Sequence, residues 1–181
     1  ALGPDVLDFT FVPFGNAFFA SSACPAKSYD HDTRMCWNAR CNVTAPPTDC
    51  FGGAGGTLVC QHGEEECDAN RMEGCAIKLA GSSRAAFPFI YCFEVLHGCK
   101  SAAAKQCATS TGLKYEDLQS CFSGSDGKAV DTNNARLTAL IPGGHAVTPW
   151  PLLNGKNLDS QADLLGAVCK AFKGPTPKGC P

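Results

Sequence analysis

The chain has 181 residues, 13 cysteines and a net charge of −2, with 44% hydrophobic and 18% charged residues. The near-neutral charge excludes the strongly basic surface of a nucleic-acid-binding protein. The hydrophobic fraction excludes a disordered chain, and no stretch approaches the roughly 20 apolar residues of a membrane span. The cytosol rarely holds so many cysteines outside metal sites, and no Cys-x2-Cys pair typical of zinc is present. The composition therefore favours a disulfide-bonded protein of the secretory pathway, with no metal and no cofactor.

The first part of the chain holds one predicted strand and one irregular segment. Residues 6–12 alternate well enough for a half-buried strand, which Pro13 ends. Residues 19–57 contain four cysteines and the glycine-rich run 52–56, so we expect an irregular, disulfide-tied segment that is mobile at its glycine end. Asn42 opens an Asn-x-Thr triplet, which makes it a candidate N-glycosylation site and agrees with the secretory pathway.

A series of helices is predicted after this segment. Three glutamates at 64–66 suit the positive end of a helix dipole, and the helix that they open is expected to reach about Ala80. Further helices are predicted over residues 87–98, 102–108, 115–122 and 128–140.

Helix geometry limits how the cysteines pair. Cys67 and Cys75 lie eight residues apart, about 12 Å on a continuous helix, whereas a disulfide needs Cα atoms within roughly 7 Å. The same argument separates Cys92 from Cys99. We therefore expect the disulfides to tie different elements together.

The C-terminal part reads as strand, hairpin, strand and helix. Residues 148–153 are apolar and extended, Asn154-Gly155 is a strong hairpin signal, and residues 156–158 can return as a short strand. An apolar stripe over 164–172 then predicts a helix. This order matches the second half of a thioredoxin-type α/β fold.

One motif carries most of the information about identity. Residues 60–75 fit the pattern C-Q-H-G-x2-E-C-x2-N-x4-C. The eight fixed positions are Cys60, Gln61, His62, Gly63, Glu66, Cys67, Asn70 and Cys75. This pattern resembles the signature of the gamma-interferon-inducible lysosomal thiol reductase (GILT) family. The resemblance covers residues 6–18 and 58–180, and the segment between them is longer and richer in cysteine than is typical of the family.

The resemblance implies an α/β, thioredoxin-like fold with a helical, disulfide-rich insertion. Residues 1–18 and 145–181 would form the thioredoxin-like part, 19–57 the irregular segment, and 58–144 the helical insertion that carries the signature. Family members reduce disulfides of unfolding proteins in acidic endosomes and lysosomes, and they use a Cys-x-x-Cys at the start of the first helix. Thr148 and Pro149 match the family's substrate-facing cis-proline loop; the plain alternative is a trans-proline that enters an edge strand.

The chain departs from the family pattern at the catalytic position. Its 181 residues contain no Cys-x-x-Cys, and by the resemblance the first strand and the start of the first helix would precede Ala1. Three explanations are open. The N-terminal piece lies in a separate segment, another segment or a second subunit of a homodimer fills the gap, or the lineage has lost the strand and repacked.

The resemblance also assigns roles to the cysteines and histidines. Eight cysteines resemble structural positions of the family: Cys60, Cys67, Cys75, Cys92, Cys107, Cys121, Cys169 and Cys180. Four more, Cys24, Cys36, Cys41 and Cys50, could pair among themselves, which would leave Cys99 as the free-thiol candidate. Gln61 and His62 are expected to order the turn before the helix, with a catalytic histidine as the alternative. His31, His97 and His145 are taken as surface or structural residues.

Two functions follow from these observations. The first is a secreted or endosomal and lysosomal GILT-like protein that has no catalytic residues in this chain and binds a protein partner, with a role in host defence. The alternative is the larger fragment of an active thiol reductase whose Cys-x-x-Cys lies in an N-terminal segment. The partner would be extracellular or at the cell surface. Residues 19–57 are the candidate binding surface, because irregular loops on a rigid scaffold commonly carry recognition.

Overall fold

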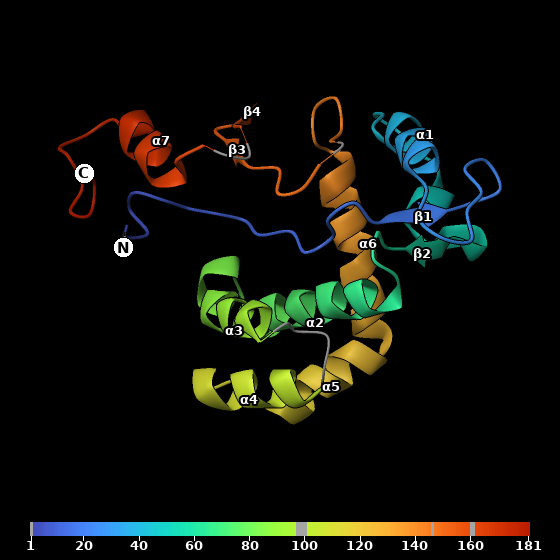
Figure 1. Ribbon diagram of the computed structural model, residues 1–181, viewed down its shortest axis with the longest axis horizontal. Helices are drawn as coiled ribbons and strands as arrows, with labels where there is room; N and C mark the ends of the chain where they lie inside the picture. The colour runs from blue at the N-terminus through green and yellow to red at the C-terminus, as the bar shows by residue number, and fades with distance from the viewer. Residues whose placement is uncertain (1, 97–100, 146, 160–161) are drawn as a thin grey trace.

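The computed structural model describes residues 2–96, 101–145, 147–159 and 162–181. These residues are mostly helical, with seven α-helices and four strands of two or three residues. The strands form two separate two-stranded antiparallel sheets. A thioredoxin-type sheet is therefore not seen in the described residues, whereas the expected series of helices and the multiple disulfides are (Figure 1).

The expectation of a strand at residues 6–12 is wrong. This stretch forms no ladder with any described strand, and an extended segment needs a paired neighbour to count as a strand. It runs instead as extended chain along the helical layer, where Phe11 N donates a hydrogen bond to Ser83 Oγ (2.9 Å) and Arg84 donates to Leu7 O. Strand β1 (Phe18–Ala20) follows and pairs antiparallel with β2 (Thr57–Val59).

Residues 19–57, which are expected from the sequence to be irregular, contain a helix. Helix α1 spans His31–Cys41, and two 3₁₀ turns span Thr48–Phe51 and Gly53–Gly55. The buried face of α1 is made of Arg34, Trp37, Asn38 and Cys41. These positions have helical spacing, but two of the four are polar, so no apolar stripe marks the helix in the sequence.

Five helices pack into one layer. They are α2 (Glu64–Ala80), α3 (Ser83–Val95), α4 (Ser101–Thr111), α5 (Tyr115–Ser123) and α6 (Ser125–Ala139). In Figure 1, α2–α5 lie below the N-terminal segment and α6 rises past it. Helix α2 has the bounds that the sequence predicts. Helix α3 begins four residues early because Ser82 caps it and accepts a hydrogen bond from Ala85 N (3.1 Å). Gly74 lets α2 approach α6, since a Cβ there would lie 2.2 Å from Val130 Cγ1.

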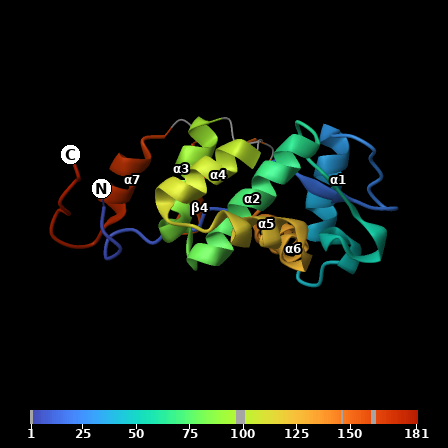
Figure 2. The ribbon, with the colours of Figure 1, turned by 90° about the horizontal axis from the view of Figure 1, so that it is seen from below.

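The C-terminal part is small and lies away from the core of the layer. Strands β3 (Leu152–Leu153) and β4 (Lys156–Asn157) form the hairpin that Asn154-Gly155 predicts, with both turn residues at positive φ. Helix α7 (Leu164–Ala171) follows, and none of its residues is fully buried. Both views place α7 at the same end of the molecule as the N-terminus (Figures 1 and 2). None of the helices described here is both long and apolar enough to cross a membrane.

Candidate functional site

The signature motif forms a tight turn at the start of α2. Cys60 and Cys67 are joined by a disulfide across this turn, with Cα atoms 5.6 Å apart. Glu66 Oε2 accepts a hydrogen bond from the backbone N–H of His62 (2.7 Å) and also contacts His62 Nδ1 (2.8 Å). The His62 side chain is 78% exposed. Glu66 therefore orders the turn, and His62 presents its ring to solvent.

Three segments that are distant in sequence meet at this turn. Asn16 Nδ2 donates a hydrogen bond to Gln61 Oε1 (2.9 Å). A Cβ added at Gly15, which has a φ of 54°, would lie 3.3 Å from Glu66 Oε1 and 4.0 Å from Thr148 Cγ2. The Gly15-Asn16 turn thus lies between the signature turn and the Thr148 loop. We call these three segments the junction: residues 15–16, 60–66 and 148–150.

The third segment of the junction contains a cis peptide bond between Thr148 and Pro149. The Trp150 ring packs beside the His145 ring, with centroids 6.0 Å apart. Two buried polar atoms in and beside this loop have no hydrogen-bond partner among the described residues, namely Asn16 Oδ1 and Trp150 Nε1. An unpaired buried polar atom costs roughly 1–3 kcal/mol. Both atoms are closed to solvent, so a ligand would gain from satisfying them once this segment shifts to expose them.

Helix α1 contributes a buried cation to the same region. Arg34 is 1% exposed; its Nε donates to Asn16 O (3.1 Å), it donates to Asn38 Oδ1, and Nη2 lies 3.1 Å from His145 Nε2. It also lies over the Trp37 ring, with Cζ 4.8 Å from the centroid. Burial lowers the pKa of Arg34 to about 10, which leaves it charged at physiological pH.

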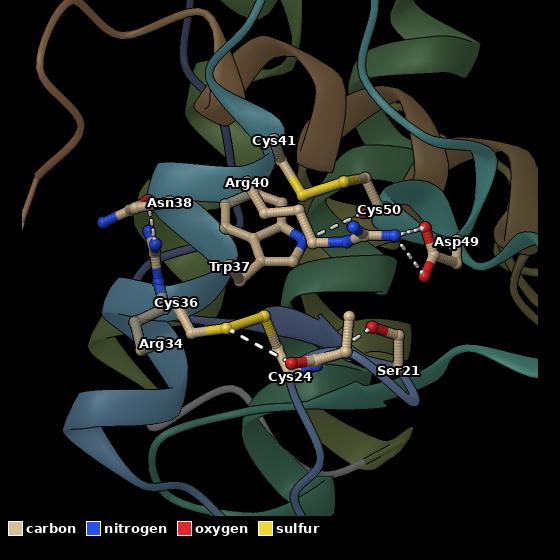
Figure 3. Close-up of a disulfide and its surroundings, with 11 residues drawn as sticks. Ser21, Cys24, Arg34, Cys36, Trp37, Asn38, Arg40, Cys41, Asp49 and Cys50 are labelled. Atoms are coloured by element: carbon tan, nitrogen blue, oxygen red, sulfur yellow. Dashed lines mark hydrogen bonds and ion pairs between the residues drawn. A yellow bond between two sulfur atoms is a disulfide. The ribbon is translucent and has the colours of Figure 1, made fainter.

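Two disulfides fix the helix that carries Arg34. Cys24 bonds Cys36 and Cys41 bonds Cys50, on either side of the buried Trp37 ring (Figure 3). The Trp37 Nε1 donates to Cys50 O (2.9 Å). The cysteine-rich segment is therefore an ordered support for the junction, and its four cysteines do pair among themselves.

The remaining predicted site residues lie in other parts of the fold. The other disulfides join Cys75 to Cys121, Cys92 to Cys107 and Cys169 to Cys180. Asn70, in the signature, lies on α2 with its Nδ2 buried and unpartnered among the described residues. Asn42 ends α1 and donates from Nδ2 to Ile141 O (2.5 Å). Cys99 and His97 lie outside the described residues. Within those residues, no group of His, Cys, Asp or Glu side chains is arranged to hold a metal ion.

Sequence reasoning missed Arg34 and gave His145 no particular role. His145 is 5% exposed and contacts a residue 111 positions away. No local pattern links two such positions. A weak signal was the spacing of Arg34, Trp37 and Cys41 on one helical face.

Comparisons with known proteins point to the same family as the signature motif at residues 60–75. Residues 42–111 match the family model of gamma interferon inducible lysosomal thiol reductase (GILT). The gamma-interferon-responsive lysosomal thiol protein of Arabidopsis thaliana is 33% identical over 130 residues, which cover 68% of this chain and 54% of that protein. The gamma-interferon-inducible lysosomal thiol reductase of Carassius auratus is 31% identical over 68% of this chain and 51% of its own length, and that of Mus musculus is 31% identical over 65% and 47%.

The chain spans about half the length of these curated relatives. The lysosomal names of the relatives and the six disulfides are consistent with a lumenal or secreted location. The signature turn, the family model and the relatives at about 30% identity agree, and the chain belongs to the GILT family.

Proposed function

We propose that this chain provides the polypeptide-binding surface of a GILT-type protein, and that the junction is where an unfolded, cysteine-containing polypeptide binds. The observation that carries the proposal is the pair of unpartnered buried atoms at the junction. Asn16 Oδ1 needs a donor and Trp150 Nε1 needs an acceptor. A polypeptide backbone supplies both groups, an N–H and a C=O, in every residue.

The 181-residue polypeptide is expected to bind such a substrate without reducing it. Disulfide reduction needs a thiolate nucleophile and a second thiol that resolves the mixed disulfide. Twelve cysteines of this chain are already in disulfides, and none of the 13 belongs to a Cys-x-x-Cys. Binding is thus the function that its own residues support.

Binding can be measured by fluorescence anisotropy with a labelled, reduced and alkylated insulin B chain as the probe. Trp150→Phe keeps the ring and removes only the Nε1 donor, while Gln61→Ala removes the partner that holds Asn16. Loss of one hydrogen bond is worth about 0.5–1.5 kcal/mol, so each variant should weaken binding by about two- to tenfold. Gln119→Ala is the matched control, because Gln119 is exposed and lies on α5, which contributes no residue to the junction. Equal affinity of Trp150→Phe and the unaltered chain would remove the proposed role of this atom.

A second function is favoured by the names of the relatives, two of which are thiol reductases. In this case the chain would act together with a Cys-x-x-Cys supplied by another segment. Insulin reduction, followed by turbidity at acidic pH, separates the two functions. The 181-residue chain should give no turnover, whereas the product of the full encoding transcript should give turnover if it supplies the dithiol. Turnover by the 181 residues alone would contradict the binding-only proposal.

A further inference from the structure

The loop that precedes Thr148 is attached to α1 by a small buried network. His145 and Arg34 are in contact (3.1 Å), and Asn38 Nδ2 donates to His145 O (3.0 Å). The backbone fits α1 closely at Gly144, which has a φ of 70° and where a Cβ would lie 3.0 Å from Asn38 Cγ. The position of Gly144 and His145, which precede the Thr148 segment of the junction, therefore depends on two side chains of α1.

The contacts of His145 define its charge state. Arg34 can only donate hydrogen bonds, so His145 Nε2 must accept from Nη2 and cannot carry a proton. The other ring nitrogen, Nδ1, lies 3.2 Å from Val147 O, which can only accept, so Nδ1 carries the proton. Both contacts are satisfied together only by the neutral imidazole with its proton on Nδ1.

Protonation of His145 would disrupt this arrangement. A second proton on Nε2 would remove the acceptor for Arg34 and place two positive charges side by side in a buried site. Arg34 is the charged group that faces His145, and Tyr29, which precedes α1, is the titratable group near Arg34. Arg34 forms no ion pair with any residue that the structure describes. Burial, and then the charge of Arg34, lowers the pKa of His145 to about 4.

We propose that Arg34 and neutral His145 are positioning residues that hold Gly144 and His145 against α1, and that protonation of His145 releases them, together with the 148–150 segment that packs on the His145 ring, as the pH falls. The inference rests on the proposed function for its consequence, which is that acid changes how the junction binds a polypeptide. In this proposal the disulfide-bonded segment 19–57 holds α1 in place, and α1 in turn positions Gly144 and His145.

The size of the effect follows from linkage. In the released loop His145 regains its ordinary pKa of 6.5, against about 4 when it is docked. Release is then favoured progressively as the pH falls from 6.5 towards 4, and it has no pH dependence from this group above 6.5. Between pH 7 and pH 5 the equilibrium constant for release should rise about 20-fold.

Native-state hydrogen exchange tests this directly, with rates corrected for the intrinsic pH dependence of exchange. The reporter is the Gly144 amide, which donates to Ile141 O (2.8 Å) inside the docked loop. Its protection factor should drop about 20-fold from pH 7 to pH 5 in the unaltered chain. His145→Gln should remove this drop, because a glutamine amide accepts from Arg34 and stays neutral. His31→Gln is the control, because His31 is exposed and begins α1, the helix that carries Arg34. This variant should keep the drop in protection. The same drop in His145→Gln would overturn the proposal.

A second variant tests the contribution of the Arg34 charge. Arg34→Gln keeps a donor towards His145 Nε2 and removes the charge, so the drop in protection should become smaller than in the unaltered chain. If this variant does not fold, His145→Gln still decides the question. Exchange does not require a bound polypeptide. Failure of insulin B chain binding at pH 7 with an intact exchange response would therefore contradict the proposed function and leave the positioning role supported.

Discussion

The segment 19–57 and the helical layer α2–α6 are held together in different ways. The layer buries an apolar core that includes Phe89, Ala104 and Leu118, and its disulfides span 46 and 15 residues. The segment buries Trp37 together with polar Arg34 and Asn38, and its disulfides span only 12 and 9 residues. The layer is thus stabilised mainly by complementary apolar faces. The segment combines a smaller apolar cluster around Phe19 and Trp37 with short cross-links and a hydrogen-bonded polar cluster.

The largest expected loss in the free energy of unfolding comes from a substitution in the apolar core of the layer. Phe89 is fully buried and stacks on Phe93, with ring centroids 5.5 Å apart. Phe89→Ala should lower the free energy of unfolding by about 3–5 kcal/mol, as measured by urea denaturation. Tyr91→Ala on the same helix is the control, because its side chain is 65% exposed; its loss should stay below about 1 kcal/mol. Similar losses in both variants would mean that this core does not hold the layer.

Removal of disulfides compares the two regions directly. The Cys75–Cys121 bond closes a loop of 46 residues and the Cys24–Cys36 bond one of 12. Because loop-closure entropy grows with length, the double alanine variant of the first pair should lose about 4 kcal/mol and that of the second about 3 kcal/mol. Chemical denaturation of both variants gives the two losses. The reverse order would show that the short cross-link does more than restrict the unfolded chain.

The layer should also respond to pH through Glu73. This side chain is 2% exposed, and burial, followed by a hydrogen bond to Glu94 and its charge, raises the pKa of Glu73 from 4.5 to about 9. The stabilisation is fully present below pH 4.5 and is lost as the pH rises towards 9. Between pH 6 and pH 8 the free energy of unfolding should fall by about 2–3 kcal/mol.

Glu73→Gln should flatten this profile, because the glutamine stays neutral throughout. Glu65→Gln is the matched control, since Glu65 lies exposed on the same helix. Denaturation midpoints collected from pH 5 to pH 9 provide the measurement. A slope that survives in Glu73→Gln would assign the pH dependence to another group.

The smallest expected loss in the free energy of unfolding comes from breaking the ion pair within segment 19–57. Arg40 Nη2 contacts both oxygens of Asp49 at 2.9 Å, and the two side chains are 34% and 16% exposed. Asp49→Asn should cost only about 0.5–1 kcal/mol, and the cost should shrink in high salt. A loss as large as that of the Cys24–Cys36 bond would show that this exposed ion pair stabilises the segment as much as the cross-link does.

The two regions also differ in how much of them could be predicted. In the layer, the acidic start at Glu64 predicted α2 with its bounds. Outside the layer, the Asn154-Gly155 turn predicted the β3–β4 hairpin. Helix α1 was missed because polar Arg34 and Asn38 occupy its buried face. The strand at 6–12 was predicted from alternation alone, which says nothing about whether a partner strand lies beside it. The Arg34–His145 contact joins residues 111 positions apart, so it belongs to the tertiary fold and has no local signature.

The prediction for Glu73 and the inference for His145 have opposite signs. Acidification should stabilise the helical layer, because Glu73 binds its proton more tightly in the folded chain. It should loosen the loop at the junction, because His145 binds its proton less tightly there. A stable layer with a releasable loop is therefore the expected state in an acidic compartment.

The order of the disulfides has a consequence for how the chain is made. Four of the six bonds join cysteines that follow one another along the chain within 12 residues, and the Cys92–Cys107 bond is nested inside the Cys75–Cys121 bond. No two of these six bonds cross. A chain that enters an oxidising lumen from its N-terminus could therefore close each bond soon after its second cysteine emerges. Among the twelve cysteines in these bonds, Cys75 would wait longest for its partner, because Cys92, Cys99 and Cys107 all emerge before Cys121. Mispairing during synthesis is therefore most exposed at Cys75.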